Sequence, residues 1–239
     1  MDKMQEALGI LEKFKDKCVD KEFEEQRKII EEEIKMDNLL PKDHPEYVKL
    51  MAFLDWLSKG GSVADKIKIR FYTPSFRGVH ARRRIRKNES FLFTPKSQII
   101  TLEMAKATPI GKKMEEAKIK LLSPKHSFLS SYVLQEKRKP DSFWKPYLDI
   151  LPNTCNNFPI FFTAEEKEWL KGSPFLDQVE EKISDMDQDY TSICDAVPEF
   201  KQFPQVEFNT IRMLVSSRIF GICIEGVKTD ALVPYAGMI

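Results

Sequence analysis

The chain has 239 residues, of which 42% are hydrophobic and 31% charged, and its formal net charge is +1. Such a composition is that of a folded protein with one or two domains and a sizeable core. The near-zero charge argues against a field of the whole molecule that would attract nucleic acid or an anionic membrane. Residues 1–17 lack the apolar stretch of a signal peptide, and no apolar run is long enough to cross a bilayer. The scattered cysteines form no C-x-x-C pair, which argues against a metal site and favours a reducing compartment, so we expect a cytoplasmic or nuclear protein that is not secreted.

The first part of the chain is predicted to be helical. Residues 4–35 are rich in Lys and Glu with sparse apolar positions, which predicts one or two exposed helices. These form either a solvated leader or a helix that binds a partner. Apolar residues at helical spacing predict a further helix over 45–58, which Gly60 and Gly61 end.

Short strands are predicted next. Ile67, Ile69 and Phe71 alternate with polar residues, as in a half-buried strand. A second strand is expected to start at Gly78, and a third over residues 90–94, where Pro95 stops it. These segments predict a small β-rich unit.

The hydrophobic period then changes from that of strands to that of helices. Thr163 and Glu166 form a capping-box pattern, which marks the start of a helix. Helices are predicted over 102–118, 125–137, 174–196 and 207–220. The sequence therefore predicts an α+β fold, with strands between residues 65 and 100 and again near the end of the chain.

Sequence motifs of common enzymes do not name a reaction. No glycine fingerprint for nucleotides, no nucleophile elbow and no H-E-x-x-H motif occurs. The one basic cluster is Arg82–Arg84 with Arg86 and Lys87. On a strand these residues would face opposite sides, which favours an exposed strand and turn. Nucleic-acid binding is the alternative, but no stacking aromatic side chains interleave with the arginines.

Several segments carry a resemblance to a known family. They are Phe53–Gly61 (FLDWLSKGG), Ser75–Ala81 (SFRGVHA) with Ile85, Asn88, Glu89 and Phe91–Pro95, Ser142–Pro152 (SFWKPYLDILP), Arg212–Arg218 (RMLVSSR) and Leu232–Ile239 (LVPYAGMI). Together they resemble the SET-domain protein methyltransferases of the Rubisco large-subunit and actin-histidine group, in the same order and spacing, over residues 45–239.

The resemblance implies a fold and an activity. The fold would be a small β-rich SET core with a large all-helical insert and a charged helical leader. The implied divisions are a leader over 1–62, the N-terminal SET β unit over 63–122, the helical insert over 123–206 and the return to the SET core over 207–239. The implied activity is S-adenosylmethionine-dependent N-methylation of a protein lysine or histidine. The implied partner is a protein substrate or a larger protein assembly, with no nucleic acid or membrane involved.

Residues for the cofactor and substrate follow only from the resemblance. The cofactor-binding positions would be Ser75, Phe76, Arg77, Gly78, Arg212, Gly237, Met238 and Ile239, and the substrate-binding positions Ser217 and Arg218. Phe76 stands where the family usually has its first glycine, and Gly237 where it has an aspartate. A guanidinium at Arg212 suits the cofactor carboxylate. The segment around Pro146 is expected to be structural, because its large aromatic groups lie between prolines that fix the backbone.

The catalytic residues are expected beyond Ile239, where the family's Asn-His pair would follow. On this interpretation the 239 residues hold an incomplete SET domain and lack a complete active site. The alternative is a SET-derived scaffold without catalysis, which would serve as an interaction subunit of a larger assembly.

Overall fold

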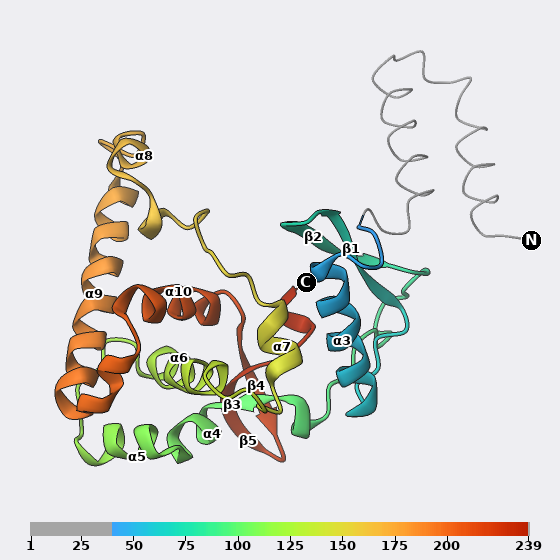
Figure 1. The fold of residues 1–239 in the computed structure, drawn as a ribbon, viewed down its shortest axis with the longest axis horizontal. Coiled ribbons are helices and arrows are strands. Elements are labelled where there is room, and N and C mark those ends of the chain that lie inside the picture. The colour runs from blue at the N-terminus through green and yellow to red at the C-terminus, as the bar shows by residue number, and fades with distance from the viewer. Residues whose placement is uncertain (1–39, 239) are drawn as a thin grey trace, which may run out of the picture. The chain divides into compact units, whose positions relative to one another are not determined.

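The computed structural model describes residues 40–238 (Figure 1). These residues fall into two compact units. The described part of the smaller unit is residues 40–41 and 70–77, and the larger unit contains residues 42–69 and 78–238. The helices predicted over 4–35 lie outside the described residues.

The predicted helix over 45–58 is confirmed as α3 (Pro45–Lys59). Its first turn is capped by His44, whose Nδ1 accepts a hydrogen bond from the backbone N–H of Glu46 at 3.2 Å. Past the end of α3, Gly61 has a φ of +92°, a backbone conformation that other residues rarely adopt. The glycine pair therefore ends α3, as predicted.

The first predicted strand is confirmed as β1 (Ile67–Thr73), and the second is present as β2 (Phe76–Ala81), which starts two residues before the predicted Gly78; the two form a two-stranded sheet. The predicted third strand over 90–94 is wrong. Only Phe93 pairs there, in an isolated antiparallel bridge with Val63. Both side chains are more than half exposed, so this segment has no core to face. The basic cluster follows Ala81, where β2 ends, and lies in a loop rather than on a strand.

A second sheet uses strands from distant parts of the chain. It contains β3 (Ile100–Thr101), β4 (Ile219–Ile224) and β5 (Val227–Leu232) in the antiparallel order β3-β5-β4. Glu225 and Gly226 join β4 to β5 with φ values of 52° and 84°, as a two-residue hairpin turn requires. The predicted helix over 207–220 is therefore too long. It ends at Ser216, because Ile219 and Phe220 pair with β5 instead.

The predicted helix over 102–118 is two helices, α4 (Leu102–Ala107) and α5 (Pro109–Glu116). Pro109 favours an extended conformation for the residue before it, and Thr108 has φ −66° and ψ 157°. The Thr108 hydroxyl also caps α5 by accepting from the N–H of Gly111 at 2.9 Å. A Cβ at Gly111 would lie 2.2 Å from the carbonyl oxygen of Ala105, so this bend needs glycine.

The remaining helices build most of the larger unit. They are α6 (Pro124–Lys137), α7 (Lys145–Ile150), α8 (Ala164–Glu168), α9 (Pro174–Ala196) and α10 (Gln205–Ser216). Single 3-10 turns lie at η1 (Lys96–Gln98), η2 (Pro159–Phe161), η3 (Pro198–Gln202) and η4 (Ala236–Met238). The predicted capping box at Thr163 and Glu166 is formed, and α9 has the predicted bounds.

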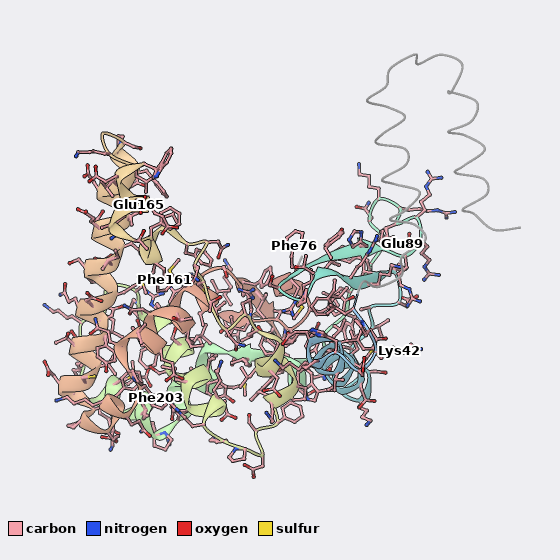
Figure 2. The ribbon with its side chains drawn as sticks, turned by 45° about the horizontal axis from the view of Figure 1, so that its top comes forward. Lys42, Phe76, Glu89, Phe161, Glu165 and Phe203 are labelled. Carbon is pink, nitrogen blue, oxygen red and sulfur yellow. The ribbon has the colours of Figure 1, made fainter. Side chains whose placement is uncertain are left out.

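Helix α6 is the centre of this arrangement. It contacts α4, α5, α7 and α10, and nine of its residues are buried. A second core lies where α9 and α10 meet η3, around the rings of Tyr190, Phe200, Phe203 and Phe208. Figure 2 labels Phe203 of this cluster. Helices and small sheets together confirm the predicted α+β class. Among residues 40–238, no helix is long and apolar enough to cross a membrane.

Candidate functional site

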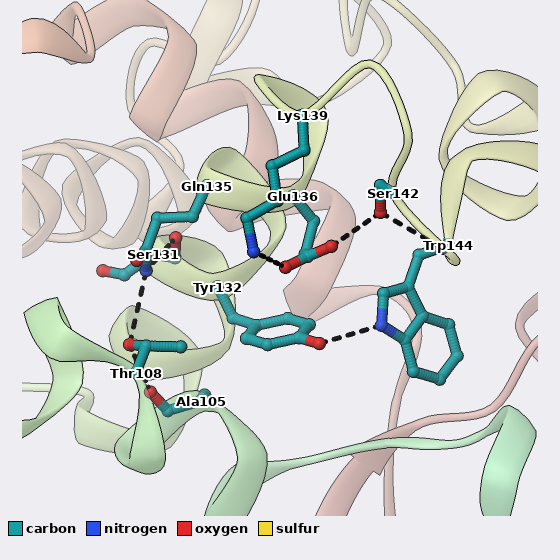
Figure 3. A network of polar contacts seen from close by, with 9 residues as sticks. All are labelled: Ala105, Thr108, Ser131, Tyr132, Gln135, Glu136, Lys139, Ser142 and Trp144. Atoms are coloured by element: carbon teal, nitrogen blue, oxygen red, sulfur yellow. Dashed lines mark hydrogen bonds and ion pairs between the residues drawn. The ribbon is translucent and has the colours of Figure 1, made fainter.

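The segment around Trp144 is a packing element (Figure 3). Its indole is only 4% exposed, and the indole N–H donates to the hydroxyl of Tyr132 on α6 at 2.8 Å. Ser142 donates to the buried carboxylate of Glu136 at 2.6 Å, and its oxygen accepts from the N–H of Trp144 at 3.1 Å. Lys139 completes the network with an ion pair to Glu136 at 2.5 Å. These contacts fix the start of α7 on α6.

The predicted glycine-type turn lies at the tip of the β1–β2 hairpin. The Thr73 hydroxyl accepts from the backbone N–H groups of Ser75 at 3.3 Å and Phe76 at 3.0 Å, which closes the turn. No residue of this turn has a positive φ, so the turn does not need glycine and accepts a phenylalanine at position 76. The Phe76 ring is 61% exposed and lies 5.3 Å from the ring of Tyr72. The guanidinium of Arg77 lies over the ring of Phe71, at 5.7 Å from its centroid.

Arg212 lies inside the helical part of the larger unit. Its side chain is 1% exposed, its Nη1 donates to the hydroxyl of Ser216 at 3.2 Å, and its Nη2 lies 3.9 Å from a carboxylate oxygen of Asp189. Its Nε is buried and has no hydrogen-bond partner among residues 40–238. Burial lowers the pKa of Arg212 to about 10, although Asp189 and Asp185 oppose the shift. The guanidinium therefore remains charged near neutral pH, and its buried Nε is a donor without an acceptor in the described part of the chain.

Asp189 holds together the three helices around Arg212. From α9, its carboxylate accepts from the N–H groups of Leu122 at 2.6 Å and Ser123 at 3.2 Å, at the start of α6. It also accepts from the hydroxyl of Ser127 at 2.8 Å. Sequence reasoning missed Asp189, although a polar residue within the apolar stripe of the 174–196 helix could have marked it.

His126 is a second residue of this region that the sequence did not single out. Burial lowers its pKa to about 4, and the positive charges of Arg212, Lys182 and Lys125 act in the same direction, against a weaker opposite effect of Asp230. Its Nδ1 is buried without a partner in the described part of the chain. The imidazole is therefore neutral near pH 7.

The predicted residues at the end of α10 and in η4 do meet. The guanidinium of Arg218 donates to the hydroxyl of Ser217 at 2.8 Å. The methylene groups of Arg218 lie against Gly237, where a Cβ would stand 3.1 Å from its Cγ. The Nε of Arg218 is also buried without a partner in residues 40–238. Met238 follows in the same turn, where its N–H donates to the carbonyl of Tyr235 at 2.9 Å.

The structure thus brings together Ser217, Arg218, Gly237 and Met238, whereas the Arg212 guanidinium contacts Ser216 and faces Asp189. Ser75, Phe76 and Arg77 belong to the smaller unit and Gly78 to the larger one. Ile239 lies outside the described residues. No group of three or more His, Cys, Asp or Glu side chains within residues 40–238 is arranged to hold a metal ion.

In fold, the chain is similar to solved SET-domain methyltransferases. The SET domain of LSMT bound to methyllysine and AdoHcy matches with a TM-score of 0.68 and 24% identity, over 80% of this chain and 44% of that chain. The structure of Rubisco LSMT bound to AdoMet matches with a TM-score of 0.65 and 23% identity, over the same shares. No family model matches the chain.

In sequence, the chain is similar to actin-histidine N-methyltransferases. It is 28% identical over 120 residues to that of Xenopus tropicalis, which covers 50% of this chain and 20% of the relative. It is 27% identical over 126 residues to that of Homo sapiens, which covers 53% of this chain and 21% of the relative. The matches thus span about a fifth of these relatives' length. The predicted resemblance to the SET-domain methyltransferases of the Rubisco large-subunit and actin-histidine group is confirmed.

Proposed function

We propose that the chain is part of an S-adenosylmethionine-dependent N-methyltransferase that acts on a lysine or histidine of a protein. The observation that carries this proposal is Arg212 on α10 of a SET-type fold, a buried and charged guanidinium whose Nε has no hydrogen-bond partner among residues 40–238. A buried donor without a partner is costly, so such a group is explained if a ligand completes it. The relatives named above methylate actin histidine or were solved with AdoMet, AdoHcy or methyllysine.

The residues of the chain fit the cofactor chemically. A guanidinium binds a carboxylate through charge-assisted hydrogen bonds, and these strengthen where water is excluded, as at Arg212. Ser75, Phe76, Arg77 and Gly78 would contribute backbone groups, as would Gly237, Met238 and Ile239. When bound, the cofactor would supply an electrophilic methyl group on a sulfonium.

The role of the protein in such a transfer is to bind and orient the two partners. Methyl transfer is an in-line displacement, and holding the target nitrogen in line with the methyl group supplies much of the rate. Ser217 and Arg218 would position the substrate, because their side chains are joined to each other and Arg218 lies beside Gly237. The residue that accepts the proton of the target nitrogen is not assigned within the described residues.

Saturation-transfer NMR with S-adenosylhomocysteine tests cofactor binding, since it detects weak complexes of the whole chain. We expect ligand signals with the 239-residue chain. They should fall strongly for Arg212→Lys, which keeps a positive charge but loses the planar fork. Arg138→Lys is the matched control. Arg138, at the end of α6, forms an exposed ion pair with Glu207, which lies on α10 as Arg212 does. Signals that are absent, or equal for Arg212→Lys and the parent chain, would contradict this role.

A SET-derived scaffold without catalysis is the second candidate. It is favoured by Gly237, which stands where the resembled family has an aspartate and leaves too little room beside Arg218 for a side chain without adjustment. In that case the chain would serve as an interaction subunit of a protein assembly. A properly folded chain that gives no ligand signal in the NMR experiment would favour the scaffold.

A further inference from the structure

A loop rich in arginine lies directly after β2. We call residues 82–87 the arginine loop. It contains five cationic residues, Arg82, Arg83, Arg84, Arg86 and Lys87, and all five are exposed. Near the labelled Glu89 in Figure 2, side chains with nitrogen at their ends extend away from the ribbon. This loop is a strong local charge on a chain whose formal net charge is only +1.

Backbone and side-chain contacts hold the loop in place. The N–H of Arg82 donates to the carbonyl of Lys66 at 2.8 Å. At the other end, the ammonium of Lys66 forms an ion pair with Glu89 at 2.9 Å and donates to the carbonyl of Ser90. Between them Asn88 has a φ of 63°, a left-handed conformation that asparagine tolerates. A loop held in this way loses little conformational entropy on binding.

Nearby carboxylates do not neutralise the loop. Asp65 pairs with Arg83. Glu89 pairs with Lys66 and also accepts from the backbone N–H of Arg86 at 2.8 Å. Within residues 40–238, no hydrogen bond or ion pair involves the charged groups of four side chains, those of Arg82, Arg84, Arg86 and Lys87. In the described part of the chain these four charges are therefore unpaired.

One arginine of the loop, Arg82, acts electrostatically on Tyr235, the residue that precedes η4. Tyr235 is 2% exposed and directly precedes η4, which contains Gly237 and Met238. Burial raises the pKa of Tyr235 to about 12, and the positive charge of Arg82 opposes that shift. The positive charge of Arg82 therefore acts on the hydroxyl of Tyr235.

We propose that the arginine loop docks an acidic segment of the protein substrate. This rests on the proposed function for the identity of the partner as a protein. Guanidinium groups match carboxylates in planar geometry, and arginine dominates this cluster. A nucleic acid is the less favoured partner, because a short loop neutralises few phosphates and no aromatic side chain interrupts residues 82–87.

Fluorescence anisotropy with a labelled peptide of about ten glutamates tests the docking directly, at low and at physiological salt. We expect the 239-residue chain to bind this probe, and Arg82→Gln/Arg84→Gln/Arg86→Gln to bind it roughly tenfold more weakly, because exposed charge pairs each contribute modestly. The matched control is Lys112→Gln/Lys120→Gln/Lys137→Gln, which removes the same charge from other exposed positions and should bind like the parent chain. An equal loss in both variants, or no binding of the peptide, would overturn the proposal.

Two further arms separate the alternatives. Replacing the same three arginines by lysine keeps the charge, so an intermediate affinity is expected if the guanidinium geometry contributes. A labelled oligothymidine of matched charge should bind no more tightly than the peptide, and tighter binding would assign the loop to nucleic acid instead. Neither arm uses cofactor or methyl transfer. A chain that binds the peptide through this loop but gives no NMR signal with S-adenosylhomocysteine would therefore retain the basic docking surface and contradict only the proposed methyltransferase activity.

Discussion

Arginine side chains lie in two opposite environments in this molecule. The side chain of Arg212 extends from α10 toward α9 and is 1% exposed, with Asp189 and Ser216 beside it. The arginine loop at residues 82–87, in contrast, is exposed. Taking a charge out of water costs several kcal/mol, which only well-placed partners offset. An exposed charge keeps its water, so it has little desolvation cost and contributes little to the free energy of unfolding. The same side chain is therefore tied to stability in one region, and in the other it is exposed and open to the partner binding proposed above.

The largest change in the free energy of unfolding is expected for a buried tryptophan compared with an exposed one. Trp144 is 4% exposed, whereas Trp169 is 87% exposed. We expect Trp144→Ala to lower the free energy of unfolding by about 3–5 kcal/mol, because it leaves a cavity and removes the hydrogen bond to Tyr132. Trp169→Ala should change it by less than about 0.5 kcal/mol. Urea unfolding followed by circular dichroism measures both. If Trp144→Ala kept full stability, the structural role of the 142–152 segment would be refuted.

The buried arginine itself is tested through its partner. Asp189→Ala should lower the free energy of unfolding by about 3 kcal/mol, because it leaves Arg212 without a counter-charge and the N–H groups of Leu122 and Ser123 without an acceptor. The control is Glu180→Ala, an exposed carboxylate on the same helix, with an expected change within about 0.5 kcal/mol. Similar losses in both variants would mean that the pair at Arg212 has no special role.

Acid should weaken the region around Arg212 through His126. The pKa of His126 falls from 6.5 to about 4 on folding, so the unfolded chain binds the proton more readily. The stability that this residue contributes is therefore present above pH 6.5 and is lost as the pH falls toward 4. After allowance for solvent screening we expect a loss of about 1–2 kcal/mol over that window.

His126→Gln isolates this effect from the carboxylates that titrate in the same experiment. The variant should show a shallower dependence of stability on pH between 6.5 and 4, measured by urea unfolding at a series of pH values. Carboxylates such as Glu89, whose pKa is lowered chiefly by its hydrogen bond from the backbone N–H of Arg86, remain in both proteins. An identical slope in the two proteins would show that His126 is not buried as described.

The smallest effect is expected for the exposed arginines. Arg82→Gln/Arg84→Gln/Arg86→Gln should change the free energy of unfolding by less than about 0.5 kcal/mol, because those side chains have no partners within residues 40–238. Thermal unfolding at low and high salt measures this change. A large destabilisation would place these arginines in the fold rather than at a docking surface, and would remove the contrast with Arg212.

Local signals account for the elements that the sequence predicted well. Helices α3 and α9 have a continuous apolar period and clear capping residues, so their bounds were close to those observed. Pro109 could have divided the predicted 102–118 helix, since the residue before a proline avoids helical geometry. The first two residues of β4, Ile219 and Phe220, were assigned to a helix because their pairing with β5 is set by contacts outside that segment.

The sequence by itself determined the α+β class, most helices, the capping box at Thr163 and the resemblance to a methyltransferase family, because these depend on neighbours along the chain. Only the tertiary structure decided that Arg212 faces Asp189, that Arg218 lies against Gly237, and that the basic cluster forms an exposed loop after Ala81. The physical reason is that burial and charge pairing depend on which distant segments meet. Spacing along the chain shows which residues share a face, but not what that face contacts.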